Sequence, residues 1–390
     1  MINKIYSLVL AAISILLFSP AIYAESPNQE PPDIVSKAAI MMEADTEQVL
    51  FAKNETKEMY PASLTKIATA IYAIENGSLD DMVTISSNAV EVDGTTVFLV
   101  EGEKVSLKKL IQGMLINSGN DASVAIAEHL SGSVEQFSKD INSYLRQFVG
   151  VQNTNFKNPH GLFHPEHVTT AEDMAKITQY AARNNVFMDI FSTKELEWNG
   201  ETWDTTIQTH HKLLKGEFPY EGVTGGKNGF VSQSGYTLAT MAEQDDLNLI
   251  VVTLNSNFKD EPYQDTIKLL DYGFGNFENS KIEEGTRFQT GNQEYITTET
   301  IIYTHASDEK SSEEIKEGGI LQLEDDLTTS TFPLEKIEEE NEKQLDSASV
   351  DNSAPASQGN ENSGPTIWIY LLGIAAVTCT AYVFWKKRAF

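Results

Sequence analysis

The order of hydrophobic patterns along the chain restricts its fold more than any other feature. Residues 37–54 read as two strands joined by a turn at Asp45-Thr46. Between about residues 61 and 182, apolar residues recur at spacings of three and four, which is typical of helices. From Gly222 the sequence alternates and turns again, as antiparallel strands do. Strands on both sides of a helical stretch predict one α+β unit over residues 34–277, with an antiparallel sheet beside a helical cluster.

Two apolar segments lie outside this unit. Residues 1–24 combine Lys4, an apolar run and a small residue at Ala24, which predicts a cleaved secretory signal; a retained membrane anchor is the alternative. Residues 367–385 are apolar over about the length that spans a bilayer, and the basic residues in 386–390 predict a cytoplasmic tail. We therefore expect a single-pass protein of the cell membrane, tethered by a C-terminal transmembrane helix, with its folded part outside the cytoplasm.

Two further segments connect the folded unit to that apolar end. Residues 280–333 contain short β-like runs and predict a small β domain, and residues 335–365 form an acidic, low-complexity linker. The net charge of −29 argues against a nucleic-acid partner. The single cysteine, Cys379, lies in the apolar end, so the exported part has no disulfide and no thiol nucleophile.

A serine and a lysine three residues apart open the first helical pattern, in "YPASLTKIATAIYAIENG". Ser63 falls in the first turn, where the helix dipole favours an alkoxide-like oxygen, and Lys66 lies one turn along on the same face. A lysine acts as a base only when burial or a second cation lowers its pKa. The pair alone is weak, because Ser106 and Lys109 repeat the spacing in what we interpret as a helix N-cap.

Two later motifs supply the missing groups. Ser118 and Asn120 lie in a break between two helical patterns, where a hydroxyl and an amide can relay a proton and hold a substrate carbonyl. Lys227, Asn228 and Gly229 lie on an expected strand and add the second cation, a hydrogen-bonding side chain and a close backbone approach.

The order S-x-x-K, S-x-N, K-x-G resembles that of penicillin-binding proteins and serine β-lactamases. The flanking sequences "PASLTK", "SGNDA", "NPHGL" and "LLDYGF" are similar to the low-molecular-mass D-alanyl-D-alanine carboxypeptidases. The resemblance covers about residues 35–277 and implies a transpeptidase-like fold with a five-stranded sheet. A small β domain before a C-terminal anchor also fits that family.

The resemblance implies that the chain removes the terminal D-alanine of peptidoglycan stem peptides. In that reaction Ser63 is the nucleophile, Lys66 its base, and Ser118 the proton donor to the leaving group. Asn120 and Lys227 would hold the acyl-enzyme, and the N–H groups of Ser63 and Phe230 would form the oxyanion hole. The resemblance implies no cofactor, and β-lactams would be covalent inhibitors of the same serine.

The chain departs from the family pattern at two places, and both concern the substrate carboxylate. Asn228 stands where the family has threonine or serine. No arginine occurs in the segment before "LLDYGF", where Lys259 is the nearest basic residue.

Three alternatives remain at this stage. A zinc site in "NPHGLFHPEH" would use His160, His164, Glu166 and His167, although Pro165 spoils a helical arrangement. A β-lactamase or endopeptidase of the same fold shares the first motifs, but the E-x-x-L-N stretch of class A β-lactamases is absent. A degenerate homologue would bind peptidoglycan stems without efficient turnover, as Asn228 and the missing arginine suggest.

Overall fold

The computed structural model describes residues 30–307 and 310–337 of the chain. No helix within these residues has the length and apolar character needed to cross a bilayer. The predicted signal at 1–24, most of the acidic linker at 335–365, the transmembrane segment at 367–385 and the tail at 386–390 lie outside the described residues, so they stay predictions.

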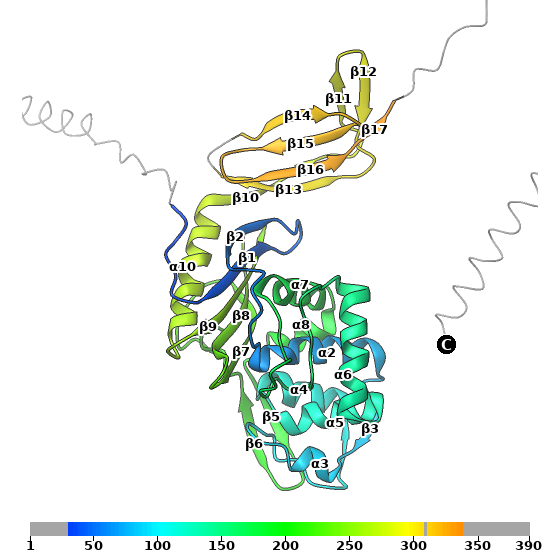
Figure 1. The fold of residues 1–390 in the computed structure, drawn as a ribbon, viewed down its shortest axis with the longest axis vertical. Coiled ribbons are helices and arrows are strands. Elements are labelled where there is room, and N and C mark those ends of the chain that lie inside the picture. The colour runs from blue at the N-terminus through cyan, green and yellow to red at the C-terminus, as the bar shows by residue number, and fades with distance from the viewer. Residues whose placement is uncertain (1–29, 308–309, 338–390) are drawn as a thin grey trace, which may run out of the picture. The chain divides into compact units, whose positions relative to one another are not determined.

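A five-stranded antiparallel sheet forms the centre of the fold, in the order β2-β1-β9-β8-β7 (Figure 1). Its strands are β1 (Ala38–Glu43), β2 (Val49–Lys53), β7 (Val223–Val231), β8 (Gly235–Gln244) and β9 (Leu247–Ser256). The N-terminal hairpin therefore pairs with strands about 200 residues later, through β1 and β9. The prediction of one α+β unit closed by a shared sheet is confirmed.

Both faces of the sheet are buried, which explains why β1 is apolar from Ala38 to Met42 and does not alternate. Ala38, Ile40 and Met42 face the helical cluster, whereas Ala39 and Met41 pack against the other core, which includes residues of α10. Helix α10 (Glu261–Asn276) covers that second face, where Leu213 of the short helix α9 (Lys212–Lys215) packs against Tyr263 of α10, and the larger helices of the cluster lie on the first face (Figure 1). Strand β7 is left as an edge, which faces the start of the helical cluster.

Helices fill most of the segment between the two parts of the sheet; the periodicity predicted them over about residues 61–182, and two short ones follow that range. They are α2 (Thr65–Asn76), α3 (Ser87–Val90), α4 (Leu107–Ile116), α5 (Asn120–Ser131), α6 (Val134–Tyr144), α7 (Ala171–Ala182), α8 (Asn185–Phe191) and α9 (Lys212–Lys215), with a 3₁₀ turn η1 (Ala62–Leu64) and a π-helical turn η2 (Leu145–Val149). Two small hairpins complete the unit: β3 (Met82–Thr84) with β4 (Lys104–Ser106), and β5 (Glu195–Asn199) with β6 (Asp204–Gln208).

The C-terminal part of the described chain contains only strands. These are β10 (Phe277–Ile282), β11 (Arg287–Thr290), β12 (Gln293–Ile296), β13 (Ile301–Ala306), β14 (Ser312–Lys316), β15 (Ile320–Glu324), β16 (Thr329–Pro333) and β17 (Glu335–Lys336). Tyr295, Leu321, Leu323 and Leu334 form a small apolar core of their own. The sequence predicted a small β domain in this region, over 280–333.

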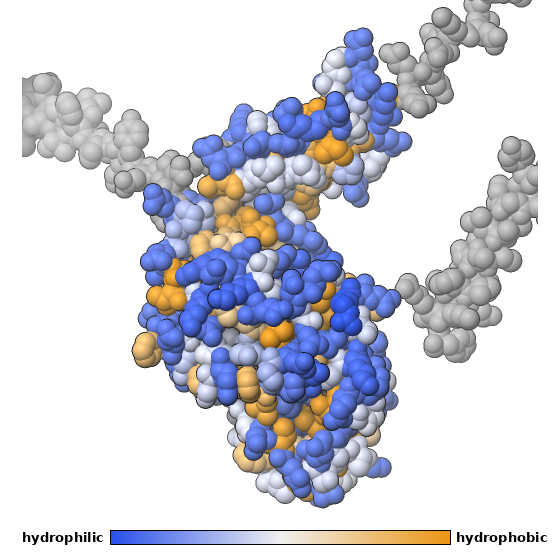
Figure 2. Space-filling model, viewed as in Figure 1, coloured by the Kyte–Doolittle hydropathy of each residue, from blue (hydrophilic) through white to orange (hydrophobic). Residues whose placement is uncertain are grey.

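Hydrophilic side chains cover most of the face seen in Figure 2, and apolar residues appear there as separate patches. Among the exposed apolar side chains, Phe98 and Phe230 are each more than half exposed. Phe230 directly follows the motif residue Gly229 and is considered with the site below.

Candidate active site

Lys66 is the centre of the site because three oxygen atoms surround its buried amine. Its side chain is completely buried, and its Nζ lies 3.1 Å from Ser63 Oγ, 2.7 Å from Asn120 Oδ1 and 2.8 Å from the carbonyl oxygen of His160. Burial holds the pKa of Lys66 well below its usual value, and the positive charge of Lys227 lowers it further, while Asp121 opposes this shift. This shift favours the neutral amine that a general base requires.

Ser63 lies in the 3₁₀ turn η1, immediately before α2, and not in the first α-helical turn that the sequence predicted. The reason is the carbonyl of Ala62, which accepts the backbone N–H of Thr65 in the i to i+3 pattern of a 3₁₀ turn. Lys66 is still one turn further along, so the predicted contact between the two side chains is present. The serine remains at the N-terminal end of the helix.

The second motif lies in a break between α4 and α5, as predicted. Ser118 is buried and has a left-handed backbone with φ of 64°, which turns the chain between the two helices. Asn120 begins α5, and its amide donates to the carbonyl of Asp93 at 2.6 Å while its Oδ1 accepts from Lys66. This bond fixes which end of the Asn120 amide faces the lysine. The Ser118 hydroxyl makes no hydrogen bond with the described residues.

The third motif lies on the edge strand β7. Lys227 is buried, and burial lowers its pKa to about 7; its Nζ donates to the carbonyl of Asn228 at 3.0 Å. A Cβ atom on Gly229 would lie 2.7 Å from the nitrogen of Ser63 and 2.6 Å from Thr237 Oγ1. Only glycine therefore lets β7 lie this close to the serine turn.

The structure thus brings the predicted residues together in two ways. Ser63, Lys66 and Asn120 share hydrogen bonds, whereas Lys227 acts on Lys66 through its charge and Gly229 through backbone contact. Asn228 is partly exposed, and the ring of Phe230 is 52% exposed and packs on Tyr236. The side chains of Asn228 and Phe230 are thus open to a ligand.

Two contributors were not predicted from the sequence. The carbonyl of His160 is a backbone atom, so no residue type signals it, although the quoted "NPHGL" marked the loop. Asp121 follows Asn120 directly, and its buried carboxylate accepts the N–H groups of Val97 and Leu99. An acidic residue inside an apolar helix pattern was the available signal for Asp121.

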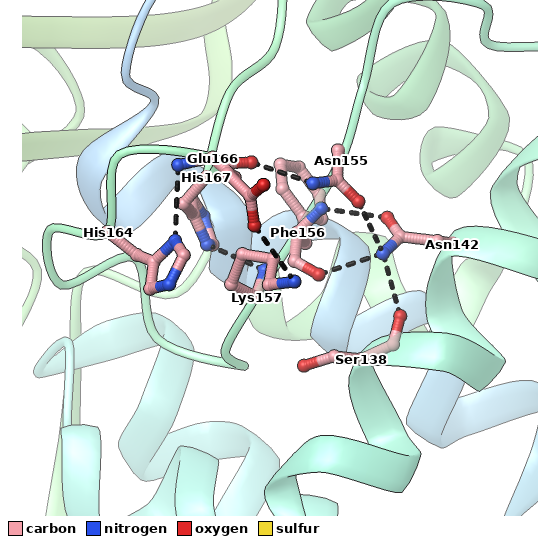
Figure 3. A network of polar contacts seen from close by, with 8 residues as sticks. All are labelled: Ser138, Asn142, Asn155, Phe156, Lys157, His164, Glu166 and His167. Atoms are coloured by element: carbon pink, nitrogen blue, oxygen red, sulfur yellow. Dashed lines mark hydrogen bonds and ion pairs between the residues drawn. The ribbon is translucent and has the colours of Figure 1, made fainter.

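Two of the histidines considered for zinc, His164 and His167, are engaged in other contacts (Figure 3). His167 Nδ1 accepts the N–H of Lys157 at 3.0 Å, His164 Nδ1 accepts the N–H of Glu166 at 3.1 Å, and Glu166 pairs with the Lys157 amine at 3.3 Å. Within 30–307 and 310–337, no three His, Cys, Asp or Glu side chains are grouped so that they could hold a metal ion.

A five-stranded antiparallel sheet beside a helical cluster, with a serine next to a buried lysine, defines a serine hydrolase of the penicillin-binding class. Residues 25–257 match the family model described as peptidase S11, D-alanyl-D-alanine carboxypeptidase. The chain belongs to this family.

Individual relatives agree with this assignment. The D-alanyl-D-alanine carboxypeptidase DacF of Bacillus subtilis is 32% identical over 285 residues, which is 71% of this chain and 72% of that protein. DacA of Haemophilus influenzae is 35% identical over 275 residues, 65% of each chain. The crystal structure of penicillin binding protein 5 from Haemophilus influenzae is 28% identical, with a TM-score of 0.69 over 79% of this chain and 98% of that chain.

The contribution of the Lys227 charge to the lowered pKa of Lys66 can be tested. Replacing Lys227 with methionine removes a positive charge beside Lys66, so the pKa of Lys66 should rise. If neutral Lys66 is the base, the acid limb of the rate–pH profile for penicillin acylation will move to higher pH. Stopped-flow acylation from about pH 5 to about pH 10 measures this limb.

Lys109→Met is the matched control, because Lys109 has the same spacing from Ser106 but its amine donates to the carbonyl of Asn199. The control should leave the acid limb in place. An acid limb at the wild-type pH in Lys227→Met would show that Lys227 does not tune the base.

Proposed function

We propose that the chain removes the C-terminal D-alanine from peptidoglycan stem peptides through an acyl-enzyme on Ser63. The observation that carries this proposal is the fully buried Lys66 amine, 3.1 Å from the serine hydroxyl and with a lowered pKa. A neutral amine at that distance can take the hydroxyl proton as the oxygen attacks. Membership of the D-alanyl-D-alanine carboxypeptidase family supports the choice of substrate.

The reaction proceeds in two acyl transfers. Ser63 Oγ attacks the carbonyl carbon between the two D-alanines, and Lys66 accepts the hydroxyl proton. The carbon–nitrogen bond then breaks, and the proton passes through Ser118 to the nitrogen of the leaving D-alanine. The N–H groups of Ser63 and Phe230 stabilise the oxyanion in both steps. Water then hydrolyses the ester and releases the shortened stem peptide.

Positive charge near β7 supports recognition of the substrate's terminal carboxylate. The pKa of His210 is lowered to about 4, first by its partial burial and then by lysines that include Lys227 and Lys259. Several lysine side chains therefore act on this corner of a chain whose net charge is −29. We assign the carboxylate to Lys227 and the Asn228 amide, with Lys259 in place of the family's arginine.

We further propose that the catalytic domain is held outside the cytoplasm by the apolar segment at 367–385. The apolar run followed by Lys386, Lys387 and Arg388 supports this orientation, and the apolar residues of 1–24 support export. Protease added to intact cells should remove the catalytic domain and leave a membrane-bound fragment of the C-terminal segment. Full protection of the catalytic domain in intact cells would contradict this orientation.

Benzylpenicillin provides the most direct test of the acyl-enzyme. The intact mass of the wild-type protein should increase by one drug mass, because the ester on Ser63 hydrolyses slowly, and Ser63→Ala should show no increase. Incubation of wild type with a peptide ending in D-Ala-D-Ala should also release D-alanine.

Other results would favour the remaining alternatives. Rapid release of penicilloyl product with no lasting adduct would indicate a β-lactamase. Binding of the stem peptide with neither an adduct nor release of D-alanine would indicate a homologue that binds without turnover.

Asn228 tests the assignment of the carboxylate. Asn228→Thr restores the hydroxyl found in the family. We therefore expect kcat/KM for a D-Ala-D-Ala peptide to rise, mainly through a lower KM. On one preparation, the fraction of protein that saturating benzylpenicillin acylates reports folding, and the KM of the peptide reports carboxylate binding. A fall in peptide turnover would show that asparagine is suited to another substrate.

A further inference from the structure

The residue before the catalytic serine has an unfavourable backbone conformation. Ala62 has φ of 49°, in the left-handed region that non-glycine residues rarely occupy. Ala62 is not a glycine, so it has no intrinsic freedom to adopt this conformation. Its side chain is only 1% exposed, so the conformation is not that of an exposed loop either. Such a conformation persists only where the surroundings hold it, and it is often found at functional sites.

Contacts from two sides hold this turn in place. On one side, the carbonyl of Ala62 accepts a hydrogen bond from Thr65 Oγ1 at 2.9 Å. A Cβ atom on Gly161 would lie 1.9 Å from the same carbonyl oxygen, so the loop containing Gly161 packs directly on it. On the other side, Thr237 Oγ1 on β8 donates to the carbonyl of Pro61 at 2.9 Å.

His167 extends this arrangement into a relay of hydrogen bonds. Its Nδ1 accepts the N–H of Lys157 at 3.0 Å, which requires the ring proton to be on Nε2. The Nε2–H therefore donates to Thr65 Oγ1, 2.8 Å away, and the Thr65 hydroxyl in turn donates to the carbonyl of Ala62. The direction of every bond in this relay follows from the first one.

The surroundings of the His167 ring keep it neutral, with its proton on Nε2. It is 2% exposed and stacks on Phe156 with centroids 5.0 Å apart. Burial, followed by the charges of His164 and Lys66, lowers the pKa of His167 to about 3, so the ring is neutral at physiological pH. A protonated ring would no longer have the Nδ1 lone pair that accepts the backbone N–H of Lys157.

The relay acts on the serine through the planarity of the peptide bond. The carbonyl of Ala62 and the N–H of Ser63 belong to one rigid peptide unit, so fixing the oxygen also fixes the direction of the N–H. That N–H is an oxyanion donor in the mechanism proposed above, and this inference rests on that mechanism. We propose that His167 and Thr65 are positioning residues that orient the Ser63 N–H for acyl transfer.

Thr65→Val tests the relay because valine keeps the shape of threonine and removes its hydroxyl. Benzylpenicillin acylation is measured as a rate constant at saturation and as a separate dissociation constant for the non-covalent complex. We expect the rate constant to fall by about tenfold or more, as for a misplaced oxyanion donor, with little change in the dissociation constant. Thr65→Ser retains a hydroxyl and should recover most of that rate.

Thr69→Val is the matched control. Thr69 is one turn further along α2 and equally buried, and its hydroxyl donates to the carbonyl of Pro159 in the same loop at 2.8 Å without contacting Ala62. It should acylate at about the wild-type rate. An equal fall in Thr69→Val and Thr65→Val would show that loop docking, and not the relay, matters, and would overturn the proposal.

His167→Phe keeps the stacking on Phe156 and removes both ring nitrogens, so it tests the relay if Thr65→Val does not fold. Where both single variants fold, the double variant should lose no more rate than the worse of the two, because both changes interrupt one relay. Wild-type acylation rates in folded Thr65→Val or His167→Phe would overturn the relay alone. Absence of acylation in the wild-type protein would instead overturn the proposed function.

Discussion

The arrangement of the whole site depends on the burial of one amine. A lysine that loses its water must find other hydrogen-bond partners, and Lys66 finds three that come from different parts of the chain. Ser63 comes from the turn before α2, Asn120 from the start of α5, and the carbonyl of His160 from the loop between η2 and α7. Packing of the helical cluster therefore also aligns the base with the serine, since the same elements carry both.

The backbone contributes as much to the site as the side chains do. Ala62 and Ser118 both have left-handed backbone conformations. Ala62 directly precedes the motif serine Ser63, and Ser118 is itself a motif serine. In both places the chain changes direction sharply at the end of a helical element, which presents a serine to the site. The cost of these two turns is offset by the well-packed core beneath them, in which Leu64 and Ile67 are fully buried.

Much of this could be predicted from the sequence because it depends on residue types and their order. The pattern of Ala38–Glu43 and Leu247–Ser256 identified strands, and the three motifs named Ser63, Lys66 and Lys227. The carbonyl of His160, the left-handed Ala62 and the partners of His167 could not be predicted, because they are fixed by tertiary packing between distant segments. His167 was noticed only as a possible metal ligand, since a sequence shows a histidine but not the hydrogen bonds that its ring makes.

The close packing around Ala62 also limits how the protein can evolve. Neither Gly161 nor Gly229 has room for a methyl group, so substitutions at these two positions disturb the serine turn directly. Asn228 and Phe230, by contrast, present their side chains toward solvent on the same strand as Gly229. Substitutions that alter inhibitor sensitivity without disturbing the serine turn are therefore expected at these open positions and not at the two glycines.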